Sequence, residues 1–298
     1  MIWLFSALFG AAIHAIANFI DKYILEKEIS DYKAIPIYTA IVSLIFGLVF
    51  WSFTGFPLLS PRDGAIVLIT GVLSAFALVF YFKALSVEET STVIILFQMI
   101  PVITIILSFL LLKETITIIQ FVGFLCVLTA TTLISFKKSR TGKTFSPAFF
   151  YILLFDFIQA ISAILVKYAL NLNSFTTIVS WESVGLAFGG IIIYIFFSSI
   201  RKAFHHSIHT IRKRVVFIIA FNDVLFIAGK LFFFFGFSKG AVSLVKVLES
   251  TQVFFGILFG VLLNLAYPMI FKEKITRHKL LRKLIASLIL IEGIILIS

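Results

Sequence analysis

Apolar runs of about 17 to 25 residues recur from one end of the chain to the other, separated by short polar breaks. A run of that length crosses a hydrocarbon core about 30 Å thick as an α-helix. The runs are continuously apolar, whereas barrel strands alternate over about ten residues, so the pattern favours helices. It predicts ten spans, near residues 2–20, 34–53, 64–85, 92–112, 116–136, 147–169, 174–198, 215–237, 241–266 and 280–298.

Composition leads to the same class. The 298-residue chain is 61% hydrophobic and 13% charged, against roughly 25% charged residues in an ordinary soluble domain. These values exclude a soluble globular protein and predict a multi-pass integral membrane protein, which we expect in a bacterial inner (plasma) membrane. Because the loops are short, they leave no room for a separate extramembrane domain, and the function is expected inside the helix bundle.

Positive charge is distributed unevenly among the loops. The chain has 25 Lys and Arg against 14 Asp and Glu, a net charge of +11. Loops after even-numbered spans contain Arg62, Lys113 and Lys239, when the near-terminal Lys83 and Lys167 are set aside. Loops after odd-numbered spans contain Lys22, Lys27, Lys33, Lys137, Lys138, Arg140, Lys143, Arg201, Lys202, Arg212, Lys213, Arg214, Lys272, Lys274, Arg277, Lys279, Arg282 and Lys283. Because cytoplasmic loops are enriched in Lys and Arg, both chain ends are predicted outside the cytoplasm, and the excess requires no nucleic-acid partner.

The longest loop, Ser199 to Arg214, has its own pattern. Apolar residues at helical spacing alternate with basic ones, which predicts a short helix lying on an anionic leaflet. Three histidines, His205, His206 and His209, fall in the same segment. No carboxylate or thiol joins them, so the segment does not predict a metal site.

A duplicated pentapeptide is the most specific local feature. Residues 113–117 read Lys-Glu-Thr-Ile-Thr and residues 272–276 read Lys-Glu-Lys-Ile-Thr, each ending a long apolar run. Such a hairpin also suits the membrane edge, because Lys-Glu cannot stay in hydrocarbon and a Thr can cap the following helix. The repeat predicts two five-helix halves, residues 1–136 and 147–298, joined by a basic loop at 137–146. An odd number of crossings gives the two copies opposite polarity, as in inverted-repeat transporters.

These residues resemble a known family. The stretch Gln98-Met99-Ile100-Pro101, about a dozen apolar residues, then residues 113–117, Gln120 and Gly123, is similar to the signature of EamA domains in the drug/metabolite transporter superfamily. The segment Tyr81-Phe82-Lys83-Ala84-Leu85-Ser86 is similar to the element that ends the third helix in that family. The second half, 147–298, resembles it less closely, since Phe255 stands where Pro101 would repeat.

The resemblance implies ten helices around a basket-like cavity and the gradient-driven movement of small metabolites. It does not identify a substrate, because members handle amino acids, nucleotide-linked compounds, sugars and lipid-linked species. Many members are described with cytoplasmic termini, which conflicts with the loop charges of this chain. We base the expected topology on the charges, which are the more direct evidence.

Ionisable side chains inside the spans are the best pointers to a site, since each costs at least ~2.5–3.5 kcal/mol to insert at the membrane centre. Those in the second half are Asp156, Glu182, Asp223, Lys230, Lys246, Glu249 and Glu292, while the first half supplies mainly His14, Asn18, Lys83 and Gln98. The remaining candidates for substrate binding or coupling are Trp181, Tyr81 and Gln252.

Helical spacing predicts how some of these charges face one another. Asp223 and Lys230 are seven residues apart and Lys246 and Glu249 three apart, so each pair shares a helix face. Adjacent spans are therefore expected to pair Lys230 with Glu249, or Lys246 with Asp223. Such a lining binds both ends of a zwitterion, and its carboxylates can carry protons. The alternative is that the charges neutralise one another and only lock the helices together.

The leading hypothesis is a secondary active transporter that moves a small polar or zwitterionic metabolite, such as an amino acid or nucleotide-related compound, by alternating access, with or without proton coupling. Alternatives are a lipid-linked substrate carrier or flippase of the same fold, and a membrane receptor or structural protein. An enzyme is not expected, because no intramembrane protease motif is present. We expect no metal, cofactor or catalytic residue, and a monomer or homodimer in the bilayer.

Overall fold

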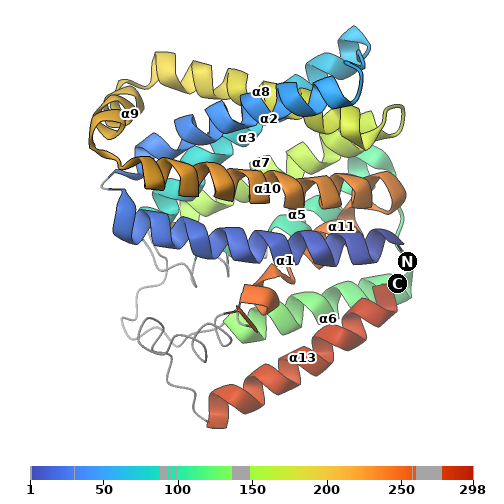
Figure 1. The fold of residues 1–298 in the computed structure, drawn as a ribbon. Helices are drawn as coiled ribbons and strands as arrows, with labels where there is room; N and C mark the ends of the chain where they lie inside the picture. Colours follow the sequence, from blue (N-terminus) through green and yellow to red (C-terminus); the bar gives the residue numbers. More distant parts are fainter. Residues whose placement is uncertain are drawn as a thin grey trace.

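The computed structural model describes residues 2–29, 31–87, 93, 96, 97, 99–135, 148–256, 258, 259 and 277–297, and this part of the chain is helical without strands. The long helices are α1 (Ile2–Tyr23), α2 (Ile35–Phe53), α3 (Pro61–Val87), α7 (Ala148–Leu170), α8 (Phe175–Phe196) and α10 (Lys213–Lys239). Each lies within a helical segment that is long and apolar enough to cross a membrane. All six run roughly parallel to one axis (Figure 1).

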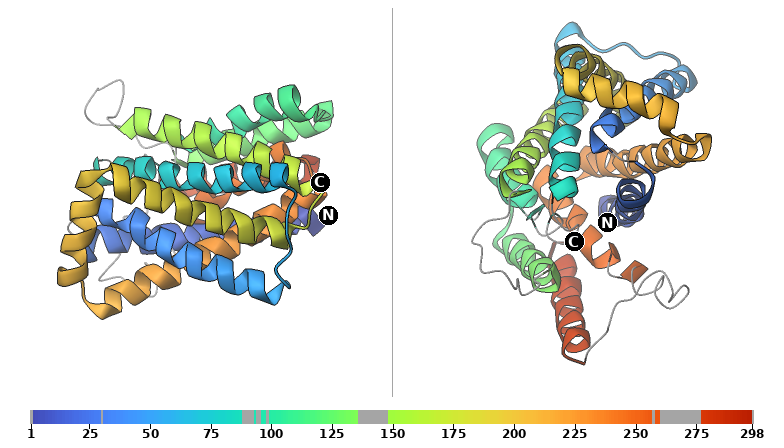
Figure 2. Two further views of the ribbon diagram at one scale, coloured as in Figure 1. Left: turned by 90° about the horizontal axis from the view of Figure 1, so that it is seen from above. Right: turned by 90° about the vertical axis from the view of Figure 1, so that its left-hand side faces the viewer.

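The other predicted spans are shorter or interrupted among the described residues. The fourth contains α5 (Met99–Leu107), which continues as the π-helix η3 (Ser108–Leu112). The ninth was predicted as one helix over 241–266, but α11 covers Val242–Glu249 and residues 250–251 form a turn. The fifth and tenth contain α6 (Ile118–Ser135) and α13 (Arg277–Ile297), which pack on each other at one edge of the bundle (Figure 2).

The order in which the helices pack has a two-fold character. Helix α3 packs on α7 and α8, and its counterpart α10 packs on α1 and α2. Helix α5 packs on α7, while α11 packs on α1. The pairs α2–α8, α5–α11 and α6–α13 each join equivalent positions of the two halves. These nine pairs, the most extensive contacts between α-helices among the described residues, map onto one another when the predicted halves 1–136 and 147–298 are exchanged.

Glycines make the closest of these contacts possible. An added Cβ at Gly71 would overlap the backbone of α8 at Glu182 and Gly185, and one at Gly185 would overlap Leu68 of α3. A Cβ on Gly189 would meet Ala75, also on α3. The Gly185-x-x-x-Gly189 motif thus lies in a contact within one chain, as small-residue motifs do where membrane helices approach closely.

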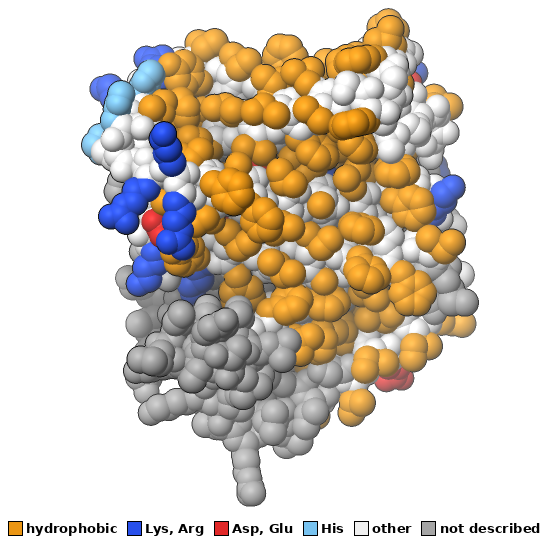
Figure 3. Space-filling model, in the orientation of Figure 1, with side chains coloured by type: hydrophobic (Ala, Val, Ile, Leu, Met, Phe, Trp, Pro, Cys, Tyr) orange, Lys and Arg blue, Asp and Glu red, His pale blue; other side chains and the backbone are white. Residues whose placement is uncertain are grey.

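The surface separates into an apolar belt and a basic end. Large hydrophobic side chains such as Phe5, Phe9 and Phe217 are exposed on the sides of the bundle. Lys, Arg and His gather at the end where α9 (Ser198–Thr210) crosses the bundle, as predicted for this amphipathic segment (Figure 3). Both chain ends lie at the opposite end (Figure 1). This arrangement is that of a multi-pass integral membrane protein with its termini away from the basic side.

Candidate functional site

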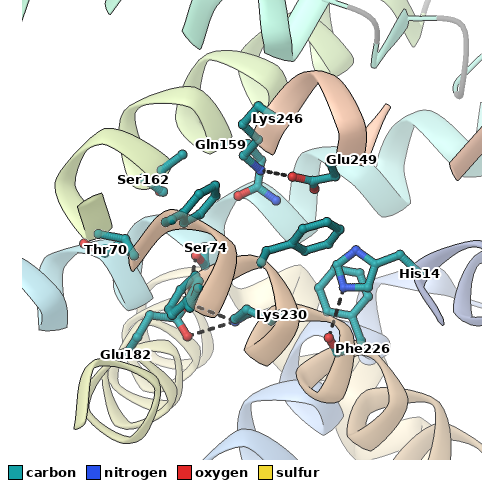
Figure 4. A pocket seen from close by; sticks show the side chains of 15 residues that line it. His14, Thr70, Ser74, Gln159, Ser162, Glu182, Phe226, Lys230, Lys246 and Glu249 are labelled. Carbon is teal, nitrogen blue, oxygen red and sulfur yellow. Dashed lines mark hydrogen bonds and ion pairs between the residues drawn. The ribbon is translucent and has the colours of Figure 1, made fainter. Parts of the chain in front are cut away.

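A cavity of about 60 Å³ lies inside the bundle, with its walls on α1, α3, α7, α8, α10 and α11 (Figure 4). About a quarter of that volume is enough for one water molecule, so the site is small in this conformation. Its polar lining residues are His14, Thr70, Ser74, Gln159, Ser162, Glu182, Lys230, Lys246 and Glu249, and its apolar ones are Ala163, Val166, Phe226, Phe233, Phe234 and Phe237.

A bidentate ion pair joins two helices across the cavity. The ammonium of Lys230 on α10 donates to both carboxylate oxygens of Glu182 on α8, at 2.8 Å and 3.0 Å. The Glu182 side chain is 1% exposed and also accepts a hydrogen bond from Ser74 Oγ on α3, at 3.2 Å. The pair is thus buried and supported from a third helix, the condition under which such a pair is tolerated in an apolar interior.

A second ion pair lies on the opposite wall, within α11. Lys246 Nζ is 2.6 Å from Glu249 Oε2, three residues further along the helix. The same ammonium lies 5.9 Å from the centre of the Phe237 ring. Figure 4 shows the two ion pairs on facing walls with Phe side chains between them. The cavity therefore presents two cations and two anions to its interior.

His14 is the residue of α1 that lines the cavity. Its ring stacks on Phe226 with centroids 4.1 Å apart and meets the edge of Phe233 at 5.0 Å. Its Nε2 lies 3.0 Å from the Phe226 carbonyl oxygen, a distance at which Nε2–H donates. Gly229 leaves room for the ring, since an added Cβ there would overlap it. The imidazole is therefore fixed by packing on α10.

Asp156 on α7 is fully buried one turn from Gln159. Neither of its carboxylate oxygens has a hydrogen-bond partner among the described residues. An unpartnered buried carboxyl is costly, so it is unusual in a purely structural position.

A further polar cluster lies nearer the basic end. Asp21 on α1 accepts hydrogen bonds from Asn222 Nδ2 at 2.8 Å and from Tyr81 Oη at 3.2 Å. Asp223, next to Asn222 on α10, accepts from Thr39 Oγ1 at 2.9 Å. Asp223 lies seven residues, about 10 Å along the helix, from the cavity lysine of α10. This cluster joins α1, α2, α3 and α10 without lining the cavity.

The structure brings together five of the predicted site residues: His14, Glu182, Lys230, Lys246 and Glu249. The predicted ion pairs were wrong, because Lys230 pairs with Glu182 and not with Glu249, and Lys246 pairs with Glu249 and not with Asp223. Asp223 and Tyr81 instead belong to the polar cluster near the basic end, and Asp156 lies beside the cavity wall without lining it.

Three other predicted residues, Trp181, Asn18 and Gln252, lie elsewhere. Trp181 points away from the cavity: its Nε1–H donates to the Pro57 carbonyl oxygen at 3.1 Å and its ring contacts Trp51. Asn18 and Gln252 are half-buried and do not line the cavity. Gln98 lies outside the described residues, as do the loop 137–146 and the second pentapeptide at 272–276.

Asp21 was missed from the sequence. The first span was predicted to end at residue 20, which placed Asp21 in a loop, but α1 continues to Tyr23 and buries this carboxylate. The prediction placed acidic residues within spans of the second half only, and it was therefore wrong. Its hydrogen-bond partners Tyr81 and Asn222 are distant in sequence, so they could not be recognised from the sequence around Asp21. The one local signal would have been a first helix that continues past its apolar run into polar residues.

The first pentapeptide joins the two halves of the chain. Glu114 accepts a hydrogen bond from the Val242 N–H at 3.1 Å, and Ser243 Oγ lies 3.5 Å from its other oxygen. A carboxylate at this position satisfies a free N–H at the start of α11. Thr117 caps α6, as predicted, and exchanges hydrogen bonds with Gln120 in a capping box.

Comparison with known proteins gives a match to one family model and matches to solved structures. Residues 1–136 match the sequence model of the EamA-like transporter family. A solved structure, titled only as the crystal structure of a protein, superposes with a TM-score of 0.66 at 15% identity over 99% of this chain and 95% of that chain. That likeness shows the fold alone. No curated protein matches the chain.

Proposed function

We propose, from the premise that residues 1–136 are an EamA-domain of the drug/metabolite transporter superfamily, that the protein is a secondary active transporter of a small zwitterionic or polar metabolite. The family premise supports a membrane transporter of this type. The substrate class, the mechanism and a bacterial inner-membrane location are our own proposals.

The observation that carries the substrate class is the pair of facing ion pairs. Lys230–Glu182 on one wall and Lys246–Glu249 on the other each combine a cation and an anion. A zwitterion has a carboxylate that needs a cation and an ammonium that needs an anion. By exchanging partners with these two pairs, it replaces buried protein–protein charge contacts with equivalent ones and leaves no charge unpaired.

Alternating access is supported by the two-fold order of helix packing. The most extensive helix pairs map onto one another when the two predicted halves are exchanged, although smaller contacts such as α7–α10 have no comparable counterpart. This pattern favours ten spans in two inverted repeats. In such transporters the site lies between the repeats, near the membrane centre. Here α1 and α3 of the first half and α7, α8, α10 and α11 of the second line one cavity. A rocking motion of one half against the other would open this cavity to each side in turn.

Coupling to protons is supported by the carboxyl groups that no cation neutralises directly. Asp156 has no hydrogen-bond partner among the described residues. Asp21 accepts hydrogen bonds from Asn222 and Tyr81, and Asp223 accepts one from Thr39, all of which are neutral donors. A buried carboxyl of this kind is accommodated best when protonated. Taking up and releasing a proton there would link the gradient to the motion of α7 and α10.

The proposal is tested by a stabilisation screen on purified protein in detergent. The panel contains the common amino acids, nucleosides and neutral sugars. A ligand at 100 times its Kd stabilises the native state by about 2.7 kcal/mol through mass action. We expect at least one amino acid to raise the melting temperature of the wild type and not of Lys230→Met. Lys202→Met, an exposed lysine on α9, is the matched control and keeps the effect. If only uncharged sugars stabilise the protein, the zwitterion proposal is wrong.

A further inference from the structure

A second hollow lies on the outer surface of the bundle, between α2 and α8. Its volume is about 140 Å³ and its lining consists of Ile37, Ala40, Ile41, Leu44, Ala187, Gly190, Ile191 and Tyr194. These positions recur every three or four residues on both helices, so the hollow is a groove that follows one face of each for about 10 Å. The floor is made of small residues: a Cβ on Gly190 would overlap Ala40.

The groove faces the apolar surroundings of the bundle. Ile41, Leu44 and Ile191 on its walls are between 37% and 51% exposed. No charged side chain lines it. A groove of this composition in the apolar belt fits a hydrocarbon chain, because the lining offers dispersion contacts and hardly any hydrogen-bond partner.

One end of the groove meets the basic helix. Tyr194, the last lining residue, has its Oη 2.8 Å from His205 Nε2 on α9. Arg201, four residues before that histidine, donates from Nη1 to the carbonyl oxygen of Ile195 at 3.1 Å. Residues four apart share a helix face, so Arg201 and His205 both sit at the end of α8, where the groove stops.

These donors can serve an anionic group at the groove end. The Arg201 guanidinium uses one of its five N–H donors in the contact with Ile195, and the others remain for a phosphate. Helix α9 contains no acidic residue, and Lys202, His206 and His209 lie exposed beside this face. Figure 1 shows α9 crossing the bundle at the end of α8.

We propose that the α2–α8 groove and the Arg201–His205 face of α9 together form a binding site for one anionic phospholipid. One acyl chain lies in the groove, and the phosphate accepts hydrogen bonds from Arg201 and His205 beside Tyr194. The pairing of an apolar groove with cationic donors at one end distinguishes this site from general attraction of a basic surface to an anionic leaflet. It is independent of the transported substrate.

Native mass spectrometry of the purified, delipidated full-length protein tests the site. The protein is mixed with equal amounts of phosphatidylglycerol and phosphatidylcholine that carry the same acyl chains. We expect one phosphatidylglycerol to be retained in preference, by about fivefold, the factor that one interfacial arginine supplies. Arg201→Gln/His205→Gln lowers that ratio to about one. Lys202→Gln/His206→Gln removes equivalent residues one position further round α9 and leaves the ratio unchanged.

Three outcomes would overturn the proposal. The first is equal retention of the two lipids by the wild type. The second is an equal loss in both double variants, which would indicate diffuse attraction to the basic end. The third is displacement of phosphatidylglycerol by inorganic phosphate at millimolar concentration, because the groove would then contribute nothing. Circular dichroism and gel filtration establish that each variant is folded, so a loss of binding is attributable to the site.

Discussion

Lys230 on α10 donates to both carboxylate oxygens of Glu182 on α8, at 2.8 Å and 3.0 Å, inside the cavity between the two halves of the chain. The lysine side chain is 14% exposed and the glutamate 1%. Two helices from the same half are thus joined by a charge contact in the interior, and α3 of the other half supports it through Ser74. This contact is at once a structural link and one of the two charge pairs that line the cavity.

Separating this pair has a predictable cost. Lys230→Met leaves the Glu182 carboxylate buried without its cation and should lower the free energy of unfolding by about 3–5 kcal/mol. The double variant Lys230→Met/Glu182→Leu removes both charges and should recover most of that loss. Thermal unfolding in detergent measures both. If the double variant is less stable than Lys230→Met, Lys230 and Glu182 do not act as a pair.

Removing the Asp156 carboxyl group should raise the free energy of unfolding, in contrast to removing Lys230. Asp156→Leu removes a buried carboxyl that has no hydrogen-bond partner among the described residues and should stabilise the fold by about 1–3 kcal/mol. The matched control is Asp63→Leu, which removes one of the two acceptors of the Asn173 amide, the other being the Ala169 carbonyl oxygen, and should destabilise. The measurement is the melting temperature of each variant relative to that of the wild type. Destabilisation by both would mean that Asp156 has a structural partner.

Glu114, which follows η3, should act as the N-terminal cap of α11. Glu114→Ala removes the acceptor of the Val242 N–H at the start of α11 and should lower the free energy of unfolding by about 1 kcal/mol, the usual worth of a helix cap. Glu28→Ala is the control, because Glu28 bonds only to the exposed Tyr23 among the contacts described. Equal melting temperatures for wild type and Glu114→Ala would show that the contact with α11 adds no stability.

The topology predicted from the loop charges can be read directly. In a Cys126→Ser background, Lys202→Cys lies at the basic end and Lys239→Cys at the end that carries the termini. A membrane-impermeant maleimide added to intact cells should label Lys239→Cys, and it should label Lys202→Cys only after lysis. The opposite labelling would place the termini in the cytoplasm, as is common in the superfamily.

The class of fold and five of the nine polar residues that line the cavity could be predicted from the sequence, for physical reasons that also explain the wrong predictions. Apolar length specifies a membrane helix almost alone, so a helix was found in every predicted span among the described residues. Helical spacing predicts which residues share a face, and this placed Lys246 and Glu249 together. It does not say which helix lies opposite, and the pairing of Lys230 therefore went to α11 in the prediction and to α8 in the structure.

Trp181 and Asp21 illustrate the same limit. Both are in spans or at their ends, and only tertiary contacts decide the direction in which each side chain points. Trp181 was predicted as a site residue beside Glu182, but neighbouring residues on a helix point about 100° apart, and its indole N–H donates to the Pro57 carbonyl oxygen instead. Asp21 was excluded because a polar residue normally ends a span, whereas Tyr81 and Asn222 make its burial possible.

The most direct test of the central claim is counterflow of a labelled amino acid into proteoliposomes. The amino acid is one that stabilises the purified protein, and the vesicles are preloaded with the same compound unlabelled. The account predicts rapid, saturable entry with the wild type and at least a tenfold slower rate with the folded double variant Lys230→Met/Glu182→Leu, since the charges that meet the zwitterion are gone. Equal rates for the two proteins would show that the cavity charges take no part in transport.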